Sequence, residues 1–325
     1  MPGLFVKSSF LISALALCWI AETSPVASTH EFILGGEQQT ASPTPRPVSY
    51  GGLPVVSPDG KRIAFVSDRA GADDVYVIAA DGRDEQQLTH TPEAEGNVAW
   101  TRDGEILFSN FQDGFSHFYM FDANGKSQRE LAKVPGRGVT LSPDGRQLLY
   151  MAGTWMASKL TVSAVDGSNA KEITDGSSIA WNSQWSPNGK MIAFTGRDDP
   201  KSELAVFVMN ADGSGLRHLT HVPAEEGGAQ VPRWSPNGQQ LAFQVNSRTQ
   251  KGSAHIWTID LRTGAERKLA AHTESYLDET PSWFPDGKQI AFQSNRTGRM
   301  EVWVMKADGT SARQVTSKAS PEKMN

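Results

Sequence analysis

Residues 185–194 read WSPNGKMIAF, and this stretch decides the fold because the chain repeats it. The Asn-Gly pair at 188–189 favours the positive φ angles of a type I′ turn, so the apolar residues on its two sides are expected to pair as a β-hairpin. Related stretches occur six times and align on a turn glycine, at Gly60, Gly104, Gly145, Gly189, Gly238 and Gly287. The sequence therefore predicts six copies of one hairpin-based unit.

The spacing of these glycines identifies the repeating unit. Successive glycines are 44, 41, 44, 49 and 49 residues apart, a period typical of the four-stranded blades of a β-propeller. Four residues before each glycine lies a large apolar residue: Val56, Trp100, Leu141, Trp185, Trp234 and Trp283. An apolar run, an aromatic or β-branched run and a second turn, usually Asp-Gly, follow in each copy. The predicted fold is all-β, a six-bladed β-propeller of four-stranded antiparallel blades.

These stretches resemble the WD40-like PD40 repeat of the TolB β-propeller family. The resemblance is carried by residues 185–194, by residues 208–213 (VMNADG) and by Leu219-Thr220, and residues 56–89 match equally well. It covers residues 54–316 and implies a six-bladed propeller in an exported, periplasmic bacterial protein that docks protein partners over its propeller face. TolB proteins carry an α/β domain before the propeller, whereas a Pro-rich linker stands in that place here.

The first residues are typical of a secretory signal. Lys7 precedes an apolar run at 10–20 that is too short to span a bilayer. We expect a signal peptide at 1–28, a Pro/Gly-rich linker at 29–52, the propeller at 53–317 and a polar tail at 318–325. Cys18, the single cysteine, would leave with the signal peptide. Its surroundings weakly resemble a lipoprotein box, so lipid anchoring at Cys18 stays open beside a free periplasmic or secreted protein.

The order of strands in a blade predicts which face carries function. If strands a to d run outward from the centre, the a–b and c–d turns emerge on one face, which we call the turn face. The b–c and d–a connections emerge on the other, the loop-rich face, where binding residues usually collect. Long loops are expected there, including residues 110–116 and 133–137. Three b–c loops, at residues 67–69, 196–198 and 294–296, contain an arginine next to Asp or Asn, as in Asn295-Arg296. This arginine is expected to tie its loop structurally.

Polar residues near the starts of the innermost strands are the predicted binding groups. We place them at the mouth of the central channel, with two a little deeper, and expect them to bind a partner. They are Asn97, Arg137, Asn182, Gln184, Gln230, Arg233 and Glu279.

Composition and motifs narrow the function classes. A net charge of −5 without a basic run argues against nucleic acid as a partner. The sequence has no Gly-x-Ser-x-Gly elbow, no His-Glu-x-x-His and no phosphate loop, so no catalytic residue, metal site or cofactor is assigned. Loop histidines are expected to be solvated, whereas convergence of three or more would indicate an enzyme. The histidines concerned are His90, His117, His221, His255 and His272.

The favoured function is an exported, monomeric binding scaffold in the cell envelope, without a membrane span after signal removal. Its partner would be a protein or peptide, or alternatively a glycan, held over the loop-rich face and the channel mouth. The competing hypothesis is a propeller enzyme, a lyase or hydrolase acting on a carbohydrate or small molecule in the channel, as the related oligogalacturonate lyases do with channel histidines.

Overall fold

A computed structural model describes residues 52–90, 95–122, 127–154, 157–176, 179–199, 201–223, 225–250, 252–269 and 276–316. The chain divides into two units, Met1–Pro47 and Val48–Asn325, and all described residues belong to the second. The predicted signal peptide, nearly all of the linker and the polar tail lie outside the described residues. Within them, no helix is long and apolar enough to cross a membrane.

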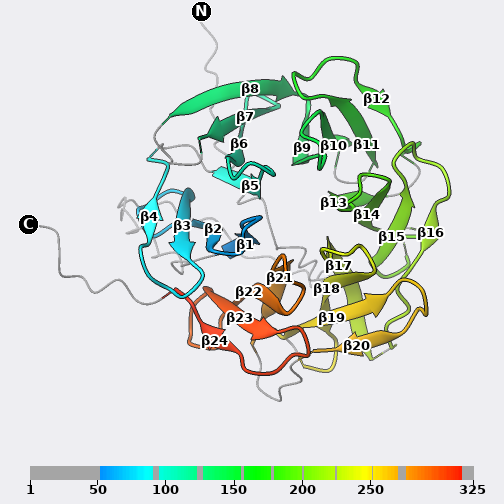
Figure 1. The fold of residues 1–325 in the computed structure, drawn as a ribbon. Helices are drawn as coiled ribbons and strands as arrows, with labels where there is room; N and C mark the ends of the chain where they lie inside the picture. Colours follow the sequence, from blue (N-terminus) through cyan, green and yellow to red (C-terminus); the bar gives the residue numbers. More distant parts are fainter. Residues whose placement is uncertain are drawn as a thin grey trace, which may run out of the picture. The chain divides into compact units, whose positions relative to one another are not determined.

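The described residues form six four-stranded antiparallel sheets, each built from four consecutive strands (Figure 1). Blade 1 contains β1 (Gly52–Val56), β2 (Arg62–Ser67), β3 (Asp74–Ala79) and β4 (Gln86–Gln87). Blade 2 contains β5 (Glu95–Trp100), β6 (Ile106–Gln112), β7 (Phe115–Phe121) and β8 (Gln128–Val134). Blade 3 contains β9 (Gly136–Leu141), β10 (Gln147–Thr154), β11 (Ala157–Ala164) and β12 (Lys171–Glu172).

The remaining three blades repeat the same order. Blade 4 contains β13 (Ala180–Trp185), β14 (Met191–Gly196), β15 (Ala205–Asn210) and β16 (Arg217–His218). Blade 5 contains β17 (Glu226–Trp234), β18 (Gln240–Ser247), β19 (Ala254–Asp260) and β20 (Glu266–Lys268). Blade 6 contains β21 (Asp278–Trp283), β22 (Gln289–Ser294), β23 (Glu301–Lys306) and β24 (Arg313–Gln314). The first strand of each blade lies nearest the centre of the ring and the fourth lies outermost (Figure 1), which confirms the predicted six-bladed propeller.

The core lies between the blades, and the second strand of each blade serves two interfaces. In β2, Ile63 and Phe65 pack in one apolar cluster with Val302 of blade 6. Ala64, between them, packs in another cluster with Phe108 of blade 2. Neighbouring residues of a strand point to opposite faces, so a continuous apolar run is needed where both faces are covered. Burial on both faces of the strand therefore explains the continuous apolar run at Ile63-Ala64-Phe65.

The turn between the first two strands differs in detail from the expected type I′ turn. In blade 4, Gly189 has φ 70° whereas Asn188 does not have positive φ, and the Gly189 amide donates to the Ser186 carbonyl at 2.8 Å. The Ser186 hydroxyl accepts from the Met191 amide at 2.9 Å and donates to the Asn188 side chain at 2.8 Å. The serine thus holds a five-residue turn, and only its glycine needs the left-handed region.

The two kinds of turn share one face, as predicted. The Ala80 amide in the β3–β4 turn donates to the Lys61 carbonyl in the β1–β2 turn at 2.8 Å. The same pairing joins Ala211 to Lys190 at 2.9 Å in blade 4 and Ala307 to Lys288 at 2.8 Å in blade 6. The arginine of the Asn295-Arg296 pair ties its loop to the first strand of the blade, as expected: both carboxylate oxygens of Asp278 accept from Arg296 at 2.7 Å.

Two predicted loops of the loop-rich face are absent as loops. Residues 110–116 belong to a hairpin in which β6 and β7 stay paired up to Gln112 and Phe115, with Asp113 (φ 53°) and Gly114 (φ 83°) as a two-residue turn. Residues 133–137 are nearly all strand, because Pro135 alone separates β8 from β9. The outer strand of blade 2, β8, has seven residues, whereas the outer strands β4, β12, β16 and β24 have two each.

The ring closes where blade 6 meets blade 1, an interface we call the seam. Each described sheet uses consecutive strands only, so side chains and single hydrogen bonds join the two ends rather than a shared blade. The Val56 amide donates to the Ser282 hydroxyl at 3.1 Å, and Arg313 donates to the Ala80 carbonyl at 2.7 Å. Phe284 stands where the other copies carry serine or threonine, and its buried ring packs in the seam cluster.

Candidate functional site

Each innermost strand contains a β-bulge at the same place. Three residues before the Trp or its equivalent, the backbone has positive φ and the pairing register shifts. The six residues are Leu53 (55°), Asn97 (50°), Gly138 (64°), Asn182 (50°), Val231 (54°) and Thr280 (50°). Gly and Asn adopt this conformation readily, but a β-branched residue does so only where the surroundings enforce it.

The bulge turns a backbone amide toward the preceding blade. The amide of Val231 donates to the Thr195 hydroxyl at 3.1 Å, and that of Thr280 donates to the Gln244 side chain at 3.1 Å. The acceptors lie on the second strands of blades 4 and 5, β14 and β18. The strain of a β-branched residue at positive φ is thereby offset by a buried hydrogen bond between blades.

A second set of bonds links the blades through tryptophan. The indole of Trp100 donates to the Val55 carbonyl at 2.9 Å, and that of Trp283 donates to the Arg233 carbonyl at 3.2 Å. Trp234 donates likewise to the carbonyl of Gln184 at 3.2 Å. The backbone carbonyls of Val55, Gln184 and Arg233, which precede Val56, Trp185 and Trp234, are thus fixed by the next blade, while the side chain at this position varies between blades.

All seven predicted binding residues lie on innermost strands. Asn97 is on β5, Arg137 on β9, Asn182 and Gln184 on β13, Gln230 and Arg233 on β17, and Glu279 on β21. Six of them are half-buried, whereas Glu279 is only 6 % exposed. Asn97 and Asn182 occupy bulge positions, so both also have a structural reason to be asparagine. The role of the seven in binding stays a prediction.

Arg233 is the one charged residue among the six that occupy the same position in the six blades. The residues immediately before the Trp or its equivalent are Val55, Ala99, Thr140, Gln184, Arg233 and Ser282. Protein surroundings lower the pKa of Arg233 from 12.5 to about 10, although the side chain keeps partial contact with solvent. It is therefore a cation at neutral pH, and its guanidinium donates to the Pro232 carbonyl at 3.0 Å.

Glu279 lies inside the protein at the seam. The Gln293 side chain donates to its carboxylate at 2.9 Å. Burial raises the pKa of the Glu279 carboxyl above 4.5, the Gln293 hydrogen bond lowers it in part, and nearby Asp278 raises it. Glu279 is thus part of the closure of the ring and does not present its carboxylate at the surface.

The histidines are not brought together in the part of the chain that the structure describes. His117 contacts Glu130 at 3.1 Å, His255 is buried beside Ser253, and His221 stacks on His218 at 4.9 Å between ring centroids. His90 is exposed, and His272 lies outside the described residues. No three His, Cys, Asp or Glu side chains among the described residues lie close enough to hold a metal ion.

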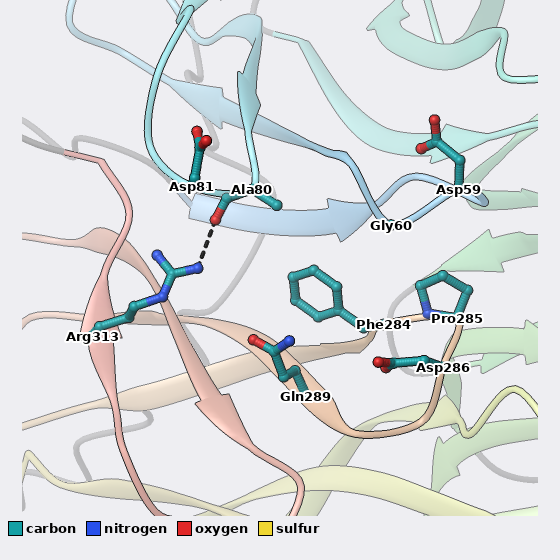
Figure 2. A pocket seen from close by; sticks show the side chains of 9 residues that line it. All are labelled: Asp59, Gly60, Ala80, Asp81, Phe284, Pro285, Asp286, Gln289 and Arg313. Carbon is teal, nitrogen blue, oxygen red and sulfur yellow. Dashed lines mark hydrogen bonds between the residues drawn. The ribbon is translucent and has the colours of Figure 1, made fainter.

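A pocket of about 330 Å³ opens on the turn face at the seam (Figure 2). Blade 1 contributes turn residues to one side, including Asp59 and Asp81, and blade 6 contributes Phe284, Asp286 and Arg313 to the other. Three carboxylates, Asp59, Asp81 and Asp286, line it, and its arginine already donates to the Ala80 carbonyl. The predicted binding residues do not line this pocket.

The tip of the β6–β7 hairpin was missed among the predicted binding residues. Its Phe111 and Phe115 are 41 % and 36 % exposed, and Leu216 is the other exposed large apolar residue among those described. The guanidinium of Arg137 lies 3.4 Å from the centre of the Phe111 ring, and the Lys133 ammonium lies 4.4 Å from that of Phe115. The Asp-Gly pair between two aromatic runs was the available sequence signal.

Comparison with known proteins gives a family and a fold. The family model described as the TolB beta propeller domain, PD40, matches residues 48–222 and 152–324, which together cover most of the chain. An uncharacterized peptidase, YuxL of Bacillus subtilis, is 28% identical over 158 residues, covering 47% of this chain and 23% of the relative. Both the relative and the TolB structure described next extend well beyond the part that this chain matches.

Two solved structures show the same fold. TolB from Acinetobacter baumannii superposes with a TM-score of 0.63 at 17% identity, over 83% of this chain and 63% of that chain. An oligogalacturonate lyase in complex with manganese superposes with a TM-score of 0.58 at 15% identity, over 86% of this chain and 80% of that chain. At these identities the similarity concerns the arrangement of the blades and leaves the chemistry open.

Proposed function

The chain belongs to the TolB beta propeller (PD40) family, and from this premise we propose that it is a binding scaffold of the cell envelope. Its partner is a protein or peptide that lies over the loop-rich face and reaches the centre of the ring. The TolB names among similar proteins support this proposal, as does the absence of any recognisable nucleophile motif from the sequence.

The observation that carries the proposal is the set of side chains before the tryptophans. Six blades present this position with the same backbone geometry, and hydrogen bonds from the next blade hold three of its carbonyls. Five of the six side chains are uncharged, and one, Arg233, is a cation. A rigid ring with different groups at equivalent positions can recognise an asymmetric ligand, because each blade offers its own contact.

Site-specific photo-crosslinking tests the position of the partner. A benzophenone amino acid replaces Gln230, on an innermost strand, in one variant, and replaces Lys61, in a tight turn of the turn face, in the control. After irradiation of cells, the Gln230 variant is expected to give protease-sensitive adducts and the Lys61 variant none. Adducts at Lys61 alone, or at neither site, would contradict the proposed face. Protease-resistant adducts would assign a glycan instead.

The proposal includes export and a monomeric state. Cell fractionation should recover the tagged protein from the periplasm or the medium, with a mature N-terminus near residue 29. Light scattering should give the mass of one chain. A full-length cytoplasmic protein would contradict the export, and a lipid-modified Cys18 would replace the free form by an anchored one.

A further inference from the structure

We infer that the tip of the β6–β7 hairpin, with Lys133 and Arg137 beside it, docks an acidic segment of a partner protein. This inference rests on the proposed binding role of the loop-rich face and names the chemistry of one contact. We call the surface formed by Phe111, Phe115, Lys133 and Arg137 the hairpin patch.

The hairpin is rigid enough to present side chains. Every residue from Ile106 to Gln112 is paired with a residue between Phe115 and Phe121, and the Asp113-Gly114 turn has positive φ at both positions. Such a turn matches the twist of paired strands, so it stabilises the tip without additional loop residues. The Ser116 hydroxyl donates to the Gly136 carbonyl at 2.5 Å, which ties the hairpin to the start of blade 3.

The two aromatic rings lie on opposite faces of this hairpin. Phe111 is paired with Ser116, and Phe115 is paired with Gln112, so alternation along the strands sends the two rings to different sides. Phe118, on the side of Phe111, packs in the cluster shared with blade 3. Tyr119, on the side of Phe115, packs against the cluster shared with blade 1. The tip therefore offers one exposed ring to each side of a projecting ridge.

Each ring carries its own cation. Arg137 lies over Phe111 and Lys133 over Phe115, at 3.4 and 4.4 Å from the ring centres. A guanidinium stacked on a ring is held in place, so it loses little freedom when it binds a carboxylate. Within the described residues Lys133 forms no ion pair, and its neighbour Glu130 is engaged by His117 at 3.1 Å.

Charge and ring geometry decide the kind of partner. Lys133 and Arg137 bring two cations to the patch. Its exposed acidic residues are Asp113 at the tip and Glu130, and Glu130 is already in contact with His117 at 3.1 Å, so the cations can attract an anionic ligand. A cation already lies over one face of each ring, so at most the other face is open for stacking against a sugar. A protein segment with carboxylates and apolar side chains matches both features, since aromatic residues and arginine dominate the energetics of protein interfaces.

Fluorescence anisotropy of the mature chain tests this inference. The probe is a fluorescein-labelled peptide of alternating Glu and Phe, with a Lys and Phe peptide and a labelled polygalacturonate as comparisons. The acidic peptide is expected to bind best and to weaken as salt increases. The double variant Phe111→Ser with Arg137→Gln should lose about tenfold or more in affinity. Phe115→Ser with Lys133→Gln should also lose affinity while leaving Arg137 intact.

A matched control variant replaces one exposed apolar residue and one exposed arginine on the turn face. Leu216, 59 % exposed, and Arg83, whose side chain is 79 % exposed, are changed to Ser and Gln, with no expected effect on binding. Equal affinity of both double variants and the wild type would overturn the inference, as would failure of the acidic peptide to bind. Preference for polygalacturonate would assign a glycan in place of the protein segment. Crosslinking at Gln230 that survives in the hairpin variants would leave the proposed function standing without this contact.

Discussion

The side-chain carbonyl of Gln293 accepts a hydrogen bond from the backbone amide of Leu53 at 2.9 Å, across 240 positions of sequence. The amide nitrogen of the same side chain donates to Glu279 at 2.9 Å. One glutamine therefore joins the bulge of the first innermost strand to the last blade. Each end of the propeller is held by the other through a buried side chain whose oxygen and nitrogen both form hydrogen bonds.

Replacement of Gln293 by Leu should destabilise the protein by about 1–3 kcal/mol, because the Leu53 amide and the Glu279 carboxylate would be left without this partner. Urea denaturation measures the change in free energy of unfolding. The control Gln147→Leu changes an exposed glutamine in β10 and should stay close to the wild type. Equal stability of the two variants would show that the seam does not depend on this bond.

Replacement of Phe284 by Ser should destabilise the protein by about 3–5 kcal/mol, even though serine is the residue most other copies carry. The ring packs with Val56, Ile63 and Val304 at the seam, and serine would leave a cavity there. Calorimetry measures the change in melting temperature. Leu216→Ser removes an exposed side chain and serves as the control. A stabilised Phe284→Ser protein would mean that the hydrogen bonds of the turn outweigh the packing of the seam.

Two tryptophans at equivalent positions should respond differently to replacement by Phe. Trp283 donates to the Arg233 carbonyl at 3.2 Å, so Trp283→Phe should cost about 0.5–1.5 kcal/mol beyond the change in packing. The buried indole nitrogen of Trp185 has no hydrogen-bond partner within the described structure, so Trp185→Phe removes an unsatisfied donor and should cost less. Chemical denaturation of the two variants in parallel measures their free energies of unfolding. A larger loss of stability in Trp185→Phe than in Trp283→Phe would contradict this prediction.

The substitution Glu279→Gln should stabilise the protein at neutral pH. Burial raises the pKa of this carboxyl in the folded state, so protonation favours folding. In the wild type, that favourable contribution is fully present below the unfolded value of 4.5 and is lost as pH rises through the folded pKa. The gain from Gln should therefore be largest above the folded pKa and should fade toward pH 4.5.

Thermal unfolding of Glu279→Gln across this pH range measures the gain. Glu225→Gln, the same substitution at an exposed position, supplies the control. A Glu279→Gln protein less stable than the wild type at neutral pH would mean that the ionised carboxylate is needed at the seam.

Sequence spacing was sufficient for the six blades and for most of their strands, because each repeat contains its own local signals. Apolar runs such as residues 63–65 need cover on both faces, and the turn glycines mark where hairpins reverse. The same reasoning misread residues 110–116 as a loop. There the alternating aromatic residues continue both strands up to the Asp113-Gly114 turn. The signal for a hairpin was therefore present in residues 110–116, but the prediction ended the two strands before this segment.

The candidate site was predictable only in part. Placement on the innermost strands follows from the order of strands, and all seven residues do lie there. Their surroundings depend on neighbouring blades: Glu279 is buried by contacts at the seam, and Arg137 lies over a ring from another blade. Burial and pKa are properties of what packs against a side chain, and period and spacing do not contain that information.

The amino-acid sequence by itself determined the six repeats, their hairpins and hence the propeller, because those features arise from interactions within about 45 residues of chain. Tertiary structure alone decided how the ring closes and which polar groups are available. Phe284, Ser282 and Gln293 meet Val56 and Leu53 only once the last blade lies against the first. The physical reason is that these contacts join distant segments, so their strength depends on packing geometry that no local pattern encodes.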